Sequence, residues 1–214
     1  MTEDEARTWM ASNVPRETLT RVEAFAGLIV REMPRQNLIA ASTAEHIWVR
    51  HILDSAQLLA LAPMGASSWI DLGAGAGFPG IVIALMVPSL RVTLVESRRK
   101  RIDFLTSAVE TLGLAARVTV AGKRLEMLDA THFDVISARA FAPLDRLLPL
   151  AHRFSRDETC WLLPKGRSAV SELEAVMTSW QGDFRIVPSM TDPEAAIIAA
   201  AKVQPRARGQ KERR

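Results

Sequence analysis

The sequence predicts an α/β protein, built as a mostly parallel, doubly wound sheet with a helical extension at its N-terminus. Two observations indicate this fold class. Apolar side chains recur at helical spacing through the first sixty or so residues, whereas short apolar runs alternate with helical segments from Ser68 onward. A glycine-rich segment follows the first apolar run, as it does where a parallel strand passes into a helix.

Helix signals dominate the N-terminal part of the chain. Thr2 with Glu5, and Ser42 with Glu45, have the spacing of capping boxes, in which two side chains satisfy the first backbone groups of a helix. We expect a short helix after Thr2 and longer ones over residues 17–33 and from 42 to about 61.

Strand signals begin near residue 68. The expected strands are 69–72, 91–96, 117–120, 133–137, 159–163, 184–187 and 195–203, with helices over 79–86, 100–112 and 168–180. The last two strands have only a short connection and are expected to form an antiparallel pair at the sheet edge. We therefore expect residues 1–62 to form the extension packed on the core, 63–204 the core itself, and 205–214 a disordered basic tail.

Composition bounds the possible functions. The chain has 214 residues, of which 48% are hydrophobic and 24% charged, which suits one globular domain with an appendage. A single cysteine, Cys160, excludes an internal disulfide framework and a multi-cysteine zinc site. His46 and His51 are five residues apart, which is not the spacing of a helical metal pair, so we expect no metal.

The sequence has no strong membrane-spanning or secretory signal and only a small net positive charge. No apolar run reaches the roughly 18 to 20 residues that span a bilayer, and the acidic N-terminus does not resemble a secretory signal. We therefore expect a soluble cytoplasmic protein. The net charge of +3 permits a polyanionic partner without requiring one. Basic residues cluster at 98–101, at 123–124 and in the tail.

The segment Asp71-Leu-Gly-Ala-Gly-Ala-Gly-Phe-Pro-Gly80 is the strongest candidate for a cofactor loop. Its glycines allow sharp turns and close approach of a ligand. Gly75, Gly77 and Gly80 have the spacing of a dinucleotide fingerprint. However, the carboxylate of Asp71 at the loop mouth would oppose a pyrophosphate, whereas it suits the ammonium and sulfonium of S-adenosylmethionine. We therefore expect the latter cofactor.

The ends of the next two strands add candidate contacts. Glu96 closes the second strand, where a carboxylate can accept both hydroxyls of an adenosine ribose, although a solvated strand end is the alternative. After the third strand, Leu125 and Glu126 are placed to border the adenine, or are simply the first turn of a helix.

The fourth strand ends in Ser137-Ala-Arg139-Ala-Phe141-Ala, where the target atom is expected to arrive. The segment has no cysteine, which excludes covalent attack on a pyrimidine at this point. It also has no Asn/Asp-Pro-Pro-aromatic sequence, which argues against methylation of an exocyclic amine through that motif. An arginine here suits orientation of a target or cofactor rather than proton removal. The alternative for Arg139 is a surface ion pair.

Further basic residues are candidate RNA contacts. Lys165 and Arg167 follow the fifth strand at the same sheet edge, and a run of four cations at the start of a helix opposes the helix dipole unless an anionic partner is present. Solvated positions are the alternative. The full set of candidates is Arg50, His51, Arg98, Arg99, Lys100, Arg101, Lys165 and Arg167.

The chain resembles the bacterial small-subunit ribosomal RNA guanine-N7 methyltransferases, also called the glucose-inhibited division protein B family. The segments that carry the resemblance are Asn37-Leu38, Arg50-His51-Ile-Leu-Asp54-Ser55, the glycine loop ending in Phe78-Pro79-Gly80, Lys100-Arg101, the Arg139 segment and Pro164-Lys165-Gly166. It extends over nearly the whole chain, from about residue 17 to 203.

The resemblance implies a Rossmann-like methyltransferase sheet, and transfer of a methyl group from S-adenosylmethionine to N7 of a guanine in 16S ribosomal RNA. The substrate would be the RNA or an assembling small subunit. Apart from the resemblance, we expect the enzyme to be a monomer. The family's cofactor positions fall on Gly73, Phe78, Leu125 with Glu126, and Arg139, and its acidic strand end on Glu96.

The chemistry of guanine N7 agrees with this set of residues. N7 has a lone pair and no proton, so its methylation needs orientation and exclusion of water rather than a general base. Two alternatives remain: an NAD(P)-dependent oxidoreductase, which would need a proton donor although the chain has no tyrosine, and a non-catalytic RNA- or ribosome-binding protein.

Overall fold

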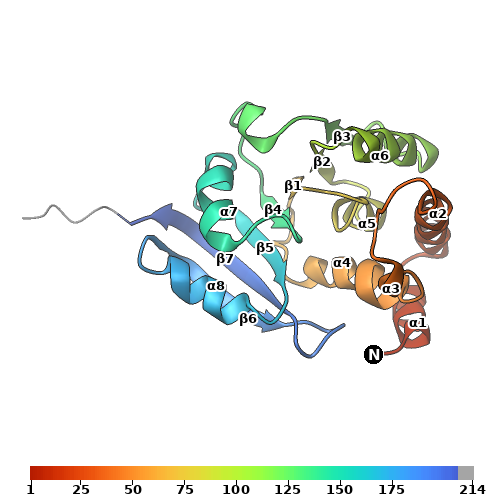
Figure 1. Cartoon of the computed structure of the whole chain (residues 1–214), viewed down its shortest axis with the longest axis horizontal. Helices are drawn as coiled ribbons and strands as arrows, with labels where there is room; N and C mark the ends of the chain where they lie inside the picture. The colour runs from red at the N-terminus through yellow and green to blue at the C-terminus, as the bar shows by residue number, and fades with distance from the viewer. Residues whose placement is uncertain (207–214) are drawn as a thin grey trace, which may run out of the picture.

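A computed structural model describes residues 1–206, and its centre is a seven-stranded sheet in the order β3-β2-β1-β4-β5-β7-β6 (Figure 1). The strands are β1 (Ser68–Leu72), β2 (Arg91–Val95), β3 (Val118–Ala121), β4 (Val135–Ala138), β5 (Cys160–Lys165), β6 (Trp180–Pro188) and β7 (Ala196–Pro205). The first five are parallel, and the chain order reverses between β1 and β4, which places a ligand site at the carboxyl ends of these two strands.

The last two strands pair antiparallel, which confirms that prediction, but they do not both lie at the edge. β7 also pairs antiparallel with β5, so only β6 is an edge strand. Burial explains the order: residues 197–200 of β7 are all buried, whereas β6 has mostly exposed or half-buried residues. A continuous apolar run suits an interior strand and a partly polar one suits an edge.

Helices cover both faces of the sheet (Figure 1). The helical elements are α1 (Glu3–Asn13), α2 (Arg16–Glu32), α3 (Ala41–Ala44), η1 (Trp48–Leu53), α4 (Asp54–Ala56), η2 (Gln57–Ala60), α5 (Gly80–Met86), α6 (Arg99–Thr111), η3 (Leu125–Met127), α7 (Leu144–Ala151), η4 (His152–Phe154) and α8 (Ala169–Val176). None of the helices in residues 1–206 is long and apolar enough to cross a membrane.

The N-terminal helices differ from the prediction at one place. The Thr2–Glu5 capping box is present, with Glu5 N–H donating to the Thr2 hydroxyl at 3.2 Å and Thr2 N–H to the Glu5 carboxylate at 2.7 Å. The prediction of a second capping box at Ser42 and Glu45 was wrong, because α3 begins after Ala40 without any side-chain cap.

The expected single helix over 42–61 is instead four short elements, including the π-helical turn η1. A distant side chain causes the break: the Glu3 carboxylate accepts hydrogen bonds from the backbone N–H groups of Trp48 and Val49 at 2.8 and 3.1 Å. A new helical segment therefore begins at Trp48, capped from α1 rather than by its own sequence.

Two further helices differ from the prediction. The helix expected over 168–180 ends at Val176, because Trp180 already belongs to β6 and is buried. Helix α7 follows the Arg139 segment and was not predicted. The basic tail is described only to Arg206, so the expectation for residues 207–214 lies outside the described residues.

Two hydrophobic cores hold the layers together. On one face, extension residues such as Met10, Phe25 and Trp48 pack with the apolar side chains of α5 and α6. On the other, α7 and α8 pack against Trp161 and its neighbours. The extension therefore forms part of the main core, which fixes its position over the carboxyl ends of the strands.

Candidate functional site

A cavity of about 830 Å³ opens at the carboxyl ends of β1, β4 and β5. Five groups of residues line it: the glycine loop with the Arg139 segment, the extension from Leu38 to Asp54, the start of α6 with Arg98 and Arg101, the segment from Pro164 to Glu172, and the loop between β6 and β7 with the start of β7. A volume of this size is typical of a site for a small molecule. The described residues hold no group of three or more His, Cys, Asp or Glu side chains able to bind a metal.

The glycine loop uses its glycines for two different purposes. Gly73, Gly75 and Gly77 have φ values of +71°, +57° and +95°, which side chains on L-residues rarely allow. Gly73 and Gly75 line the cavity. Gly77 faces the core, where a Cβ would lie 2.6 Å from Ile81. The sequence predicts all three at the cofactor, and the structure brings Gly73 and Gly75 to the cavity, whereas Gly77 packs closely against the core.

Asp71 does not line the cavity as the sequence led us to expect. It is completely buried, and its two carboxylate oxygens accept hydrogen bonds from the Gly80 N–H at 2.9 Å and the Ser137 hydroxyl at 2.8 Å. Burial raises its pKa to about 6, although these hydrogen bonds oppose the shift. Asp71 thus joins β1, β4 and the start of α5 behind the loop.

Glu96 lies beside the cavity, at the end of β2. Its carboxylate accepts hydrogen bonds from the N–H groups of Gly75, Ser97 and Arg98 at 3.2, 2.7 and 2.9 Å, and lies 3.7 Å from the Arg101 guanidinium. This carboxylate therefore ties the glycine loop to the start of α6. Leu125 is buried in the core on the other face and Glu126 is exposed, and neither lines the cavity.

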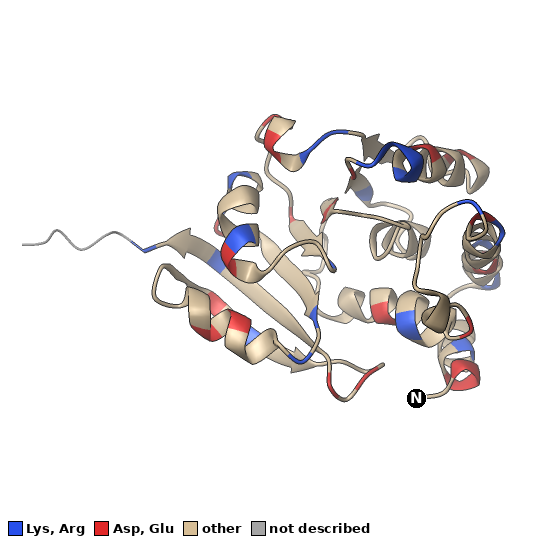
Figure 2. Ribbon diagram, in the orientation of Figure 1, with Lys and Arg blue, Asp and Glu red and all other residues tan. Residues whose placement is uncertain are grey.

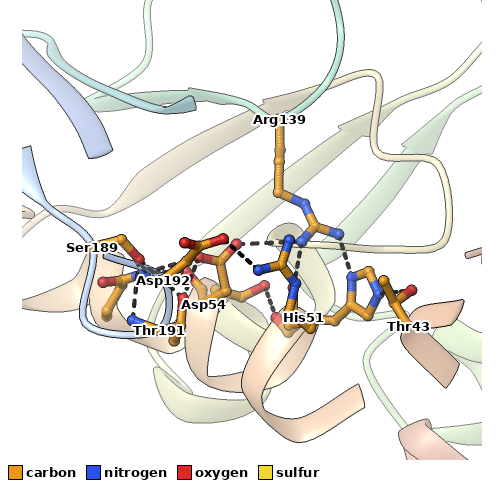
Figure 3. Close-up of polar contacts among 10 residues, drawn as sticks. Thr43, His51, Asp54, Arg139, Ser189, Thr191 and Asp192 are labelled. Carbon is orange, nitrogen blue, oxygen red and sulfur yellow. Dashed lines mark hydrogen bonds and ion pairs between the residues drawn. The ribbon is translucent and has the colours of Figure 1, made fainter. Parts of the chain in front are cut away.

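Arg139 is held by the N-terminal extension (Figure 3). Its Nη1 donates to the main-chain carbonyl of Arg50 at 3.1 Å and to Asp54 Oδ2 at 3.3 Å. Its Nη2 donates to His51 Nδ1 at 2.9 Å, and the guanidinium lies 5.3 Å from the centre of the Phe78 ring. These contacts use three of the five guanidinium N–H groups, so two remain for a ligand in the cavity.

The contacts of Arg139 fix the state of His51. An arginine only donates hydrogen bonds, so His51 Nδ1 must be unprotonated and Nε2 carries the proton. Nε2 lies 2.9 Å from the Thr43 hydroxyl, which in turn donates to the Ala40 carbonyl at 2.9 Å. The ring stacks on Phe78 at 5.0 Å. Burial, followed by the charges of Arg139 and Arg50, lowers the pKa of His51 to about 3.

This shift predicts a specific loss of stability at acid pH. In the unfolded state His51 takes up a proton below about pH 6.5, whereas in the folded protein it stays neutral down to about pH 3. Between these values the unfolded state binds more protons. The free energy of unfolding therefore falls as the pH is lowered, by at most about 1.4 kcal/mol per pH unit. The raised pKa of Asp71 acts in the opposite direction, with stability lost as the pH rises from about 4 to 6.

The comparison of wild type with His51→Gln isolates the histidine, because both proteins retain Asp71. Urea unfolding from pH 7 to pH 4 should show the stability advantage of the wild type shrinking by about 1 kcal/mol per pH unit. Parallel pH profiles for the two proteins would show that His51 is not held neutral.

Several candidate RNA contacts are already engaged by acidic side chains. Arg50 pairs with Asp192 at 2.5 Å, Lys165 with Glu172 at 2.7 Å, and Arg167 with Glu194. At the start of α6, Arg99 pairs with Asp103 at 3.0 Å on the exposed surface, and Arg101 lies near Glu96. Arg98 is exposed and lines the cavity, and Lys100 is exposed in a neighbouring groove between α2 and α6.

Sequence reasoning missed the residues that complete the Arg139 site. Asp54 appeared only within a motif, and Thr43 and Thr191 carried no signal at all, because single polar residues outside strand ends are common. Gly73 also depends on Phe141, whose ring would lie 2.5 Å from a Cβ at that glycine. Phe141 follows Ala140, which adopts a φ of +51° and thereby turns the segment toward the loop.

Comparison with known proteins identifies the family. The GidB family model, described as rRNA small subunit methyltransferase G, matches residues 18–196. A protein of Rhizorhabdus wittichii named Ribosomal RNA small subunit methyltransferase G is 71% identical over 215 residues, which cover 100% of this chain and 99% of that protein. A protein of the same name from Zymomonas mobilis subsp. mobilis is 50% identical, with 96% of each chain covered.

Among solved structures, the S-adenosylmethionine-dependent methyltransferase SibL in its apo form aligns with a TM-score of 0.59 over 74% of this chain and 57% of that chain. Its 16% identity shows the fold alone, which is the predicted Rossmann-like methyltransferase sheet. The family model that matches most of the chain, and the relatives that align over nearly its full length, also show the family. The chain belongs to the rRNA small subunit methyltransferase G family, an S-adenosylmethionine-dependent methyltransferase family.

Proposed function

We propose that this protein transfers a methyl group from S-adenosylmethionine to N7 of a guanine in small-subunit (16S) ribosomal RNA. The observation that carries the proposal is the cavity in which three contacts hold Arg139. Among the described residues that line it, the carboxylates of Asp54, Glu172 and Asp192 are all paired with cationic side chains. Family membership supports the substrate class, since the relatives named above are ribosomal RNA small subunit methyltransferases.

The residues at the loop fit the cofactor. Gly73 and Gly75 would let it approach the backbone, because both have positive φ values and line the cavity. Glu96 would accept the ribose hydroxyls, and Phe78 and Arg139 would contact the methionine part. We also propose that the adenine lies beside Leu125 and Glu126, at the margin of the site: neither residue lines the cavity, but η3 follows β3 at the same sheet edge.

A methyl acceptor that must lose a proton needs a base, and the basic groups among the described cavity residues are already engaged. S-adenosylmethionine, when bound, supplies a methyl group activated by its sulfonium. Among the described residues that line the cavity, His51 is the only histidine, and its Nδ1 lone pair already accepts a hydrogen bond from Arg139. With a pKa near 3 it cannot compete for a substrate proton at neutral pH. A nitrogen without a proton, such as guanine N7, needs no such base.

Arg139 and the walls of the cavity supply orientation instead. Two N–H groups of the guanidinium remain available for an acceptor on the nucleotide or the cofactor. The extension and the β6–β7 loop form two walls of the cavity. Holding the reacting atoms in near-attack geometry is the main contribution that such a reaction needs.

The RNA is proposed to cross a basic rim beside the cavity, formed by Arg98, Arg99, Lys100, Lys123 and Arg124. Figure 2 shows basic segments at the start of α6 and after β3. The two segments are neighbours, because a Cβ at Gly122 would lie 3.2 Å from Ile102 of α6. Within residues 1–206, Lys123 and Arg124 have no acidic side chain within 4.0 Å, so they are available to phosphates.

The rim predicts a salt dependence. Replacing both Lys123 and Arg124 with glutamine should weaken binding to 16S RNA and reduce the slope of log affinity against log salt by about one to two units. Fluorescence anisotropy at several salt concentrations measures the slope. Glutamine at the exposed residues Arg16 and Arg185 is the charge-matched control and should leave it unchanged. Equal slopes for both double variants would place the RNA elsewhere.

Neither alternative function gains support from the site. An oxidoreductase would need a proton donor near its nicotinamide, and the single histidine of the cavity is fully engaged. A non-catalytic RNA-binding protein would not need the intact glycine loop. We further propose that the enzyme acts in the cytoplasm, where ribosomal RNA is processed, and that it acts as a monomer.

A direct test uses purified protein and S-adenosylmethionine with a labelled methyl group. Small ribosomal subunits, free 16S RNA and large-subunit RNA, all from cells lacking the protein, serve as substrates. Label should enter small-subunit RNA and be recovered as 7-methylguanosine after digestion. Label in another base, in large-subunit RNA only, or in none would contradict the proposal.

A further inference from the structure

The loop between β6 and β7, residues 189–195, brings another group of polar side chains to the Arg139 site (Figure 3). The Thr191 hydroxyl donates to Asp54 Oδ1 at 3.0 Å, and Thr191 is 8% exposed. Asp54 Oδ2 accepts from Arg139 at 3.3 Å. A buried hydroxyl from the far end of the chain is therefore two interactions away from the guanidinium.

The hydrogen bonds around Thr191 have a single consistent direction. A carboxylate only accepts, so the one Thr191 hydroxyl proton goes to Asp54. The Ser189 hydroxyl, 2.9 Å from Thr191 Oγ1, must then be the donor of that pair. Ser189 Oγ itself accepts from the Gln57 amide at 3.1 Å and from the Thr191 N–H at 3.2 Å. Each hydroxyl proton thus has one acceptor, which specifies one arrangement of the loop.

Two more contacts dock this loop on the extension. The Met190 N–H donates to Gln57 Oε1 at 2.8 Å, and Asp192 pairs with Arg50 at 2.5 Å. Because Gln57 also donates to Asp54 Oδ1 at 2.9 Å, the loop and the extension hold the same carboxylate from two sides.

We propose that Thr191 is a positioning residue for methyl transfer, which acts through Asp54 to fix the Arg139 guanidinium at the cavity. This inference rests on the proposed function, in which Arg139 orients the reactants. Without the Thr191 hydroxyl, Asp54 Oδ1 keeps only its hydrogen bond from Gln57. The carboxylate is then free to rotate, which loosens the contact between Asp54 and Arg139. A displacement of about 1 Å in an orienting group lowers a rate by about a hundredfold.

The test compares three substitutions in the full-length protein. Thr191→Val replaces the hydroxyl with a methyl group, and we expect kcat for methyl transfer to small-subunit RNA to fall about ten- to hundredfold while both KM values stay within about twofold. Thr191→Ser keeps the hydroxyl and should restore most of kcat. Met190→Ala, in the same loop but with an exposed side chain outside the cavity, should match the wild type.

A double-mutant cycle distinguishes positioning from a general structural role. In an Arg139→Lys background, Thr191→Val should cause little further loss, because the residue through which it acts is already changed. Unfolding by urea and affinity for S-adenosylhomocysteine show that each variant is folded, and Thr191→Ala replaces the valine variant if that one does not fold.

Wild-type kcat in Thr191→Val, or an equal loss in both backgrounds, would overturn the role of Thr191. Absence of methyl transfer to ribosomal RNA by the wild type itself would instead overturn the proposed function, so the two failures are separable.

Discussion

Replacing Arg139 with alanine is expected to lower methyl transfer to small-subunit RNA by about two to three orders of magnitude, with the protein still folded. The guanidinium is fixed by the Arg50 carbonyl, Asp54 and His51, and its remaining N–H groups belong to the cavity. Arg139→Lys should also be strongly impaired, because an ammonium cannot reproduce the planar fork that meets these acceptors. Single-turnover rates with labelled S-adenosylmethionine measure both variants.

The matched control for Arg139 is Arg185→Ala, which removes an exposed arginine on β6 away from the cavity and should leave the rate unchanged. If Arg139→Ala transferred methyl groups at the wild-type rate, Arg139 would have no orienting role, and the proposals for Asp54 and Thr191 would fail with it.

Gly73→Ala is expected to have the second large effect, on cofactor binding. A Cβ there would lie 2.5 Å from the Phe141 ring, in a residue whose φ of +71° already disfavours a side chain. Either the ring or the loop must move, and both border the cavity. We expect affinity for S-adenosylhomocysteine to fall at least about tenfold and the free energy of unfolding to fall by about 2–3 kcal/mol.

Gly113→Ala separates the effect of backbone strain at a positive φ from the effect of the close contact with Phe141. Gly113 has a similar φ of +62°, but a Cβ there would have no neighbour within 4 Å. That variant should lose only about 1 kcal/mol of stability and bind S-adenosylhomocysteine normally, as measured by urea unfolding and calorimetry. Equal cofactor affinity in the two variants would show that the close contact between Gly73 and Phe141 does not shape the site.

The sheet and the glycine loop were predictable because their signals are local. A short apolar run marks each strand, and Gly73 marks a backbone position with positive φ. The break in the segment 42–61 was not predictable, because the cap of η1 comes from Glu3, more than forty residues earlier. A pattern of apolar spacing carries no information about such a contact.

The candidate site was only partly predictable for a similar reason. The sequence located Asp71 at the loop but not the direction of its side chain, which Ser137 and the start of α5 determine. It located Arg139 at a strand end but not its surroundings, because Asp54 meets Arg139, and Thr191 meets Asp54, only after the extension and the β6–β7 loop have docked.

The most direct test of the central claim is a map of N7-methylguanosine in small-subunit ribosomal RNA from cells with and without the protein. Reduction and aniline cleavage at methylated guanines, read by primer extension, locates the modification. We predict that one site is lost when the gene is deleted, returns with the wild-type gene, and does not return with Arg139→Ala. An unchanged pattern of N7-methylguanosine in the deletion strain would contradict it.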